Sequence, residues 1–180
     1  MDEISHLDHN WEVKIIPNED FVLRQVHILR TKDINGKKIP TEAAFSLRSS
    51  DLEGLSVNWE RYITIKENYI LLGLTFNSNK KFVDYTLFKI FKIQVQFIRS
   101  LENIEDVVHS PVFHGSLPPI GRPNNYAHSL IQGEIDEEVR MGLADYCMNN
   151  YEDSYCKYQV ATLNTEINSL RQRLDEQVSG

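Results

Sequence analysis

The period of the hydrophobic pattern changes once along this chain, and that change limits the folds it can adopt. Segments 21–30 and 89–97 alternate between two faces with a period of two and are rich in Val, Ile and Phe, which is typical of β-strands. After residue 134 the apolar residues recur at three- and four-residue steps, as on one face of an amphipathic helix. We therefore predict an α+β fold, with a mainly antiparallel sheet in residues 11–115 followed by C-terminal amphipathic helices.

The same pattern divides the chain into two regions. Residues 1–133 are predicted to form a sheet-rich domain that includes a long Pro- and Gly-rich loop at 109–133, and residues 134–180 a helical region. Within the first region the shorter elements are predicted from local composition. They are strands at Trp11–Ile16 and Tyr69–Phe76, a strand at Leu55–Glu60 entering a helical turn capped by Asn58, and a tight turn at Asn35-Gly36.

The loop holds an unusual share of the histidines and prolines. Three of the six histidines and four of the six prolines lie within 109–129, and so long a segment without regular structure is usually a binding loop, an active-site loop or disordered. A metal would have to be held by the loop histidines and a nearby carboxylate: His109, His114 and His128 with Asp106 or Glu134. Their spacing matches no metal-binding signature, so no metal is predicted.

The loop also offers groups that suit a phosphate or a nucleotide. Its glycines allow close approach of the backbone, and Arg122 and Ser129 are the candidate substrate-binding residues, since a guanidinium and a helix start both favour anions. The acidic cluster that begins at Glu134 counts against this interpretation because it would repel an anion. A packed surface loop is the simpler alternative.

A site shared between the sheet and the loop is the candidate for catalysis. Arg24 and His27 are three residues apart in a predicted strand, so they project to opposite faces and one of them points toward the core. A buried polar side chain needs a partner, and His128 is the predicted acid or base because imidazole titrates near neutral pH. Arg24 or Arg122 would bind an anionic substrate. The candidate catalytic residues are His128, His27, Arg24, Ser46 and Ser56, with Glu60 as a further possible partner.

Two resemblances accompany these residues. At the level of residue types, the combination of Arg, His, Ser and Glu is similar to the ADP-ribosyltransferase-like folds, and this implies an early Arg or His that binds nicotinamide dinucleotide and a later Glu or Gln that polarises the ribose. The chain also resembles a pattern in small bacterial proteins without an assigned activity, so that resemblance assigns no functional residue. The segments that carry it are Leu23–His27, Ala44–Ser46, Leu55–Val57 and Asn125–Ser129.

The last part of the chain has the most regular pattern. Its apolar residues alternate steps of three and four, which is the a/d seam of a heptad repeat. The seam must be buried, either against the preceding helix or sheet or against another chain, and we predict the second. The predicted partner interface, within a seam at 160–178, is Val160, Leu163, Ile167, Leu170 and Leu174.

Composition limits the functional classes. The net charge of −7 argues against nonspecific nucleic-acid binding, which needs Lys and Arg on phosphates. An acidic start, two cysteines outside any CxxC pair and the lack of a long apolar run predict a cytoplasmic, reduced protein away from membranes. The leading hypothesis is an interaction module of a bacterial multi-protein system that uses its C-terminal helix for self-association or partner docking. The alternative is an enzyme acting on a nucleotide or phosphate ester, and no cofactor is assigned.

Overall fold

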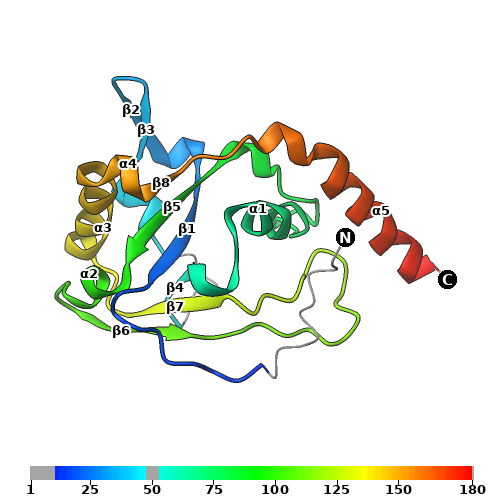
Figure 1. Cartoon of the computed structure of the whole chain (residues 1–180), viewed down its shortest axis with the longest axis horizontal. Helices are drawn as coiled ribbons and strands as arrows, with labels where there is room; N and C mark the ends of the chain where they lie inside the picture. The colour runs from blue at the N-terminus through cyan, green and yellow to red at the C-terminus, as the bar shows by residue number, and fades with distance from the viewer. Residues whose placement is uncertain (1–10, 48–52, 180) are drawn as a thin grey trace.

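The computed structural model describes residues 11–47 and 53–179, and within them six antiparallel strands form one sheet in the order β6-β7-β4-β1-β5-β8 (Figure 1). A separate hairpin, β2 (Thr31–Ile34) with β3 (Lys37–Pro40), projects from the end of β1. The predicted α+β class with a mainly antiparallel sheet is confirmed. The strands of the sheet are β1 (Phe21–His27), β4 (Leu55–Trp59), β5 (Phe88–Gln94), β6 (Ile104–His109), β7 (His128–Gly133) and β8 (Tyr155–Cys156).

Helices cover both faces of this sheet, α3 on one side and α1 on the other (Figure 1). Short 3-10 turns lie between the longer elements, at 28–30, 42–45, 60–62, 85–87 and 160–163. No helix in the described part of the chain is both long and apolar enough to cross a membrane. The helices are α1 (Ile65–Gly73), α2 (Val95–Arg99), α3 (Glu137–Asn149), α4 (Tyr151–Ser154) and α5 (Asn164–Ser179).

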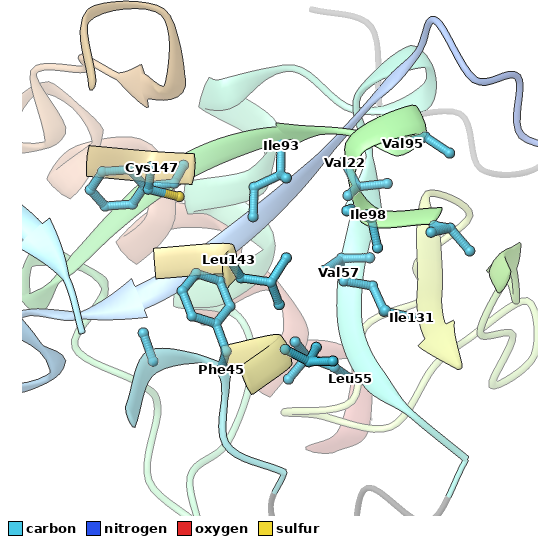
Figure 2. Close-up of a cluster of buried hydrophobic side chains, with 14 of the residues drawn as sticks. Val22, Phe45, Leu55, Val57, Ile93, Val95, Ile98, Ile131, Leu143 and Cys147 are labelled. Atoms are coloured by element: carbon cyan, nitrogen blue, oxygen red, sulfur yellow. The ribbon is translucent and has the colours of Figure 1, made fainter. Parts of the chain in front are cut away.

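Each face of the sheet has its own hydrophobic cluster, because alternate residues of a strand point to opposite faces. We call the face covered by α2 and α3 the α3 face; here Leu143 and Cys147 of α3 pack against strand residues such as Val57 and Ile93 (Figure 2). The other, the α1 face, buries strand residues Leu23 and Ile90 beneath Tyr69, Ile70 and Leu72 of α1. In β1, Val22 and Val26 therefore belong to the α3 face and Leu23 to the α1 face.

The largest error of the sequence prediction is the strand at Tyr69–Phe76, where the structure has helix α1 instead. Thr64 and Glu67 form a reciprocal capping box at its start, a motif that specifies a helix N-terminus. Short apolar runs do not distinguish a buried helix from a buried strand. The capping-box residues Thr64 and Glu67 are the sequence signal that favours a helix over a strand here.

Several smaller predictions are also wrong. The strands predicted at 21–30 and 89–97 end at His27 and Gln94, and β7 lies inside the segment predicted as a loop at 109–133. Residues 11–16 carry no strand; the backbone N–H of Lys14 donates to the ring of His109 and not to a strand backbone. Asn58 does not cap the 3-10 turn at 60–62, because Trp59 occupies the cap position without a side-chain bond. The turn at Asn35-Gly36 is confirmed, with φ of 53° and 76°, the left-handed pair that a two-residue hairpin turn requires.

Candidate functional site

A serine and a histidine from neighbouring strands are hydrogen-bonded on the α1 face. Strands β4 and β7 pair with Asn58 opposite His128 and Ser56 opposite Leu130, so Ser56 and His128 are diagonal neighbours on one face. Ser56 Oγ lies 2.9 Å from His128 Nε2. Both side chains are half-buried. This arrangement places a hydroxyl against the ring nitrogen of a potential base.

The backbone of Ser110 fixes the orientation of the ring. His128 Nδ1 lies 2.7 Å from the Ser110 carbonyl oxygen, and the Ser110 N–H donates to the His128 carbonyl at 2.9 Å. A carbonyl oxygen only accepts, so Nδ1 carries the proton and Nε2 presents its lone pair. When the ring is neutral, this leaves Nε2 as the acceptor of a hydrogen bond from the Ser56 hydroxyl.

Four amide side chains form a hydrogen-bonded group beside this pair, since the strand position of Asn58 is opposite His128. We call them the amide cluster: Gln25, Asn58, Asn68 and Asn125. Asn125 Nδ2 donates to Asn58 Oδ1 at 2.7 Å, and Asn58 Nδ2 donates to Asn68 Oδ1 at 3.4 Å. Gln25 Nε2 also donates to Asn68 Oδ1. The cluster thus joins β1, β4, α1 and the loop beside His128.

The Pro- and Gly-rich loop positions Asn125 through ordered contacts. Val112 and Asn125 exchange two backbone hydrogen bonds of 2.9 and 2.8 Å. The Asn124 side chain accepts from the His114 N–H and donates to the Gly115 carbonyl. These hydrogen bonds hold Asn125 in place, and the bond between the Ser110 N–H and the His128 carbonyl joins Ser110 to β7.

The pair has the geometry of a nucleophile and its base. In serine-dependent acyl transfer a histidine nitrogen within 2.6–3.2 Å of the hydroxyl takes its proton, and a third group holds the ring. Ser56, His128 and the Ser110 carbonyl meet that description. A carbonyl supports the imidazolium less strongly than a carboxylate does, because it carries no net charge.

Arg24 lies on the opposite face from this pair. In β1 it shares the α3 face with Val22 and Val26. The residue is 8% exposed. Nε and Nη2 donate to the Ala44 carbonyl at 3.2 and 2.9 Å, and Nη1 donates to the Ser56 carbonyl at 2.6 Å. These bonds direct the guanidinium at backbone carbonyls inside the domain, and the role of Arg24 in anion binding stays a prediction.

The other predicted site residues do not join Ser56 and His128. His27 Nδ1 accepts from the Leu29 N–H and the ring packs edge-on against Phe88. Ser46 follows the turn at 42–45, where its N–H donates to the Ala43 carbonyl, and Glu60 lies 4.0 Å from Lys92. Ser129 is fully buried with its hydroxyl on the Ala127 carbonyl, and the Arg122 side chain is exposed. These contacts are those of structural or surface residues.

The three loop histidines occupy separate environments. His109 is buried among Trp59, Tyr62 and Tyr126. Its Nδ1 accepts from the Lys14 N–H, and its Nε2 lies 2.6 Å from the Tyr126 carbonyl. His114 is exposed. Over residues 11–47 and 53–179, no group of three His, Cys, Asp or Glu side chains could hold a metal ion.

The predicted partner interface divides into two parts. Leu163 and Ile167 are buried in the chain's own cluster on the α1 face, and Val160 and Leu170 pack at its edge. Leu174 is half-buried and lies outside that cluster. Packing within the chain therefore accounts for the first half of the seam and corrects the assignment of Leu163 and Ile167 to a partner interface, since both are inaccessible.

Sequence reasoning selected Ser56 and His128 but missed most of their neighbours. Ser110 and Asn125 lie inside the loop that was singled out, and Asn58 stands two residues from Ser56, so period-two alternation could have placed it on the same face. Asn68 gave no signal, because its segment was assigned to a strand. Comparisons with protein-family models, with curated proteins and with solved structures find no match.

Proposed function

We propose that this protein is an enzyme of acyl transfer or hydrolysis in which Ser56 is the nucleophile and His128 its general base. The observation that carries the proposal is the aligned set of contacts, 2.9 Å from Ser56 Oγ to His128 Nε2 and 2.7 Å from Nδ1 to the Ser110 carbonyl. In a neutral ring protonated at Nδ1, Nε2 is the proton acceptor. The hypothesis of an interaction module has less support, because Leu163 and Ile167 of the heptad seam are buried in the chain's own core.

The reaction follows from where the protons lie. Ser56 Oγ attacks the acyl carbon of an ester while its proton moves to His128 Nε2, and the imidazolium keeps its Nδ1–H bond to the Ser110 carbonyl. The bond to the leaving oxygen breaks, and Nε2–H protonates that oxygen. Water then attacks the acyl-Ser56 ester, gives its proton to Nε2, and the acid leaves as Ser56 regains the proton.

A fluorophosphonate probe tests this directly. The Ser56 oxygen would bond to phosphorus as fluoride leaves, and peptide mass spectrometry would locate the adduct. We expect labelling at Ser56, none in Ser56→Ala, and a rate reduced by about 10²–10⁴ in His128→Gln, the usual size of a general-base contribution. Ser116→Ala, in an exposed part of the loop, is the matched control. An unlabelled Ser56 in folded protein, or unchanged labelling in His128→Gln, would refute the proposal.

A second proposal keeps α5 as a self-association element. It is favoured by one observation: the apolar seam continues to Leu174 beyond the core cluster, where the last turns of α5 extend past the rest of the domain (Figure 1). Exposed Arg173 and Glu176 beside it suit pairing with a second, antiparallel copy. Light scattering after size exclusion should give a dimer for the wild type and a monomer for Leu174→Glu. A wild-type monomer at high micromolar concentration rules this proposal out.

A further inference from the structure

The backbone of Ser56 faces away from the strand that carries His128. The Trp59 N–H donates to the carbonyl of Ala127, the residue before β7, at 2.7 Å, so the peptide groups of Trp59 face β7. In an antiparallel pair, residues bonded to the partner strand alternate with residues whose peptide groups face the other way. Ser56 stands three positions before Trp59 in β4, and its peptide groups therefore face β1.

On that side the ladder of backbone hydrogen bonds ends before it reaches Ser56. Within the described residues, the pairing of β1 with β4 ends at Leu23 opposite Asn58. Nη1 of Arg24, the next residue of β1, donates to the Ser56 carbonyl at 2.6 Å. An arginine side chain thus takes the place of a ladder bond at the residue that carries the proposed nucleophile.

The same guanidinium is anchored in the core. Its Nε and Nη2 both donate to the Ala44 carbonyl, at 3.2 and 2.9 Å, and Ala44 is 1% exposed within the hydrophobic cluster of the α3 face. A planar guanidinium holds its donors in a rigid fork, whereas an ammonium group is a compact charge on a flexible stem. The fork of Arg24 therefore ties the backbone of Ser56 to a buried turn.

We infer that Arg24 is a positioning residue, which holds Ser56 Oγ in line with His128 Nε2 through the Ser56 backbone. This inference rests on the proposed function and adds a residue that acts on the nucleophile from behind. Ser56 Oγ lies 2.9 Å from Nε2, and the serine side chain is too short to compensate for a shift of its own backbone. A misplacement of reacting groups by about 1 Å can lower a rate by about 10²-fold.

The fluorophosphonate reaction of Ser56 tests the inference when the limiting rate, kinact, is separated from KI, the probe concentration at half that rate. Arg24→Lys keeps the charge and loses the fork. We expect kinact, corrected for the folded fraction from urea unfolding, to fall by about 10- to 10²-fold, and KI to stay as in the wild type. Arg171→Lys is the matched control, because Nε and Nη2 of Arg171 donate in the same way to the Gly73 carbonyl, at 3.0 and 2.7 Å. It should leave kinact unchanged.

Ala44→Gly is a second variant, because glycine adds backbone freedom to the turn that anchors the guanidinium. It should lower kinact by a smaller factor than Arg24→Lys. An unchanged kinact in folded Arg24→Lys, or in Ala44→Gly if Arg24→Lys does not fold, would overturn the inference and leave the nucleophile in place.

The other failures are distinguishable. A raised KI with an unchanged kinact would assign Arg24 to ligand binding and overturn the positioning role. An equal loss of kinact in Arg171→Lys would also overturn it, because the effect would then be general to arginines that support the backbone. A wild type without an adduct at Ser56 would overturn the proposed function, and the positioning role with it.

Discussion

The contact between Ile167 and Gly73 allows a quantitative test of where α5 packs. Ile167 is 0% exposed, and a methyl group built on Gly73 would lie 3.0 Å from two of its side-chain carbons and 3.1 Å from the Tyr85 ring. Replacing a fully buried Ile by Ala costs about 2–5 kcal/mol in free energy of unfolding. Ile167→Ala should therefore remove a large part of the about 5–15 kcal/mol that stabilises a typical domain.

Combining Gly73→Ala with Ile167→Ala measures the same contact as a coupling free energy between the two substitutions. In the wild type the new methyl group overpacks the site, at a cost of about 1–3 kcal/mol, against a gain in helix propensity of about 1 kcal/mol. With Ala at 167 the crowding from Ile167 disappears and the methyl group occupies part of the cavity. We expect the double variant to be more stable than the sum of the single changes predicts, by about 0.5–3 kcal/mol.

Urea unfolding monitored by circular dichroism, at two protein concentrations tenfold apart, measures both quantities. The half-buried Leu174 supplies the control, since Leu174→Ala should cost less than Ile167→Ala. The reasoning is refuted if Ile167→Ala costs less than about 1 kcal/mol, or if the two changes add within about 0.5 kcal/mol. A midpoint that rises with protein concentration would show that association between chains contributes to the stability.

Three further predictions follow from single contacts. Burial raises the pKa of Cys147 to about 12 and that of Cys156 to about 11, so both thiols should react slowly with DTNB at pH 8 until urea unfolds the chain. Bonding of the Val139 N–H to the Asp136 carboxylate lowers the pKa of Asp136, so its stabilisation is complete above the ordinary carboxyl pKa and lost as pH falls through the lowered value. Urea midpoints of the wild type and Asp136→Asn should therefore converge in acid. Gly121→Ala should unfold or strongly destabilise the chain in a thermal melt, because φ is +76° and the added carbon would lie 2.1 Å from the Phe76 ring; a melting temperature within about 2 °C of the wild type, a change of 1 kcal/mol or less, would contradict this.

The fold class was predictable because the periodic signals were local. Alternation in β1 and β5 and the helical steps after residue 134 report which faces are buried, whatever the topology. The helix at Glu137–Asn149 begins after Asp136, within the acidic cluster that predicted it. The strand order was not predictable, since β4 lies between β7 and β1 through contacts distant in sequence.

The candidate site was only partly predictable, because it also depends on contacts between residues that are distant in sequence. His128 and Ser56 stand 72 residues apart, and their meeting depends on the register of β4 with β7. A shift of one residue would have moved each side chain to the other face. Arg24 illustrates the converse: it approaches Ser56 closely, yet through the Ser56 backbone carbonyl on the far side of the sheet. Residue types alone could not distinguish the side-chain contact of His128 with Ser56 from the contact of Arg24 with the Ser56 backbone.

The two faces of the sheet differ in how completely their polar groups are satisfied. On the α3 face the Arg24 guanidinium meets two carbonyls, as a structural residue should. On the α1 face Asn68 keeps a fully buried amide donor that has no partner among residues 11–47 and 53–179, and such a group costs about 1–3 kcal/mol. Hydrophobic residues in its place would fill the space without that cost. Local inconsistencies of this kind are expected at functional sites, and this one is linked through Asn58 to the strand position that carries His128. The unsatisfied donor thus belongs to the same hydrogen-bonded group as Asn58, whose backbone is paired with His128, and a purely structural serine–histidine contact would not require it there.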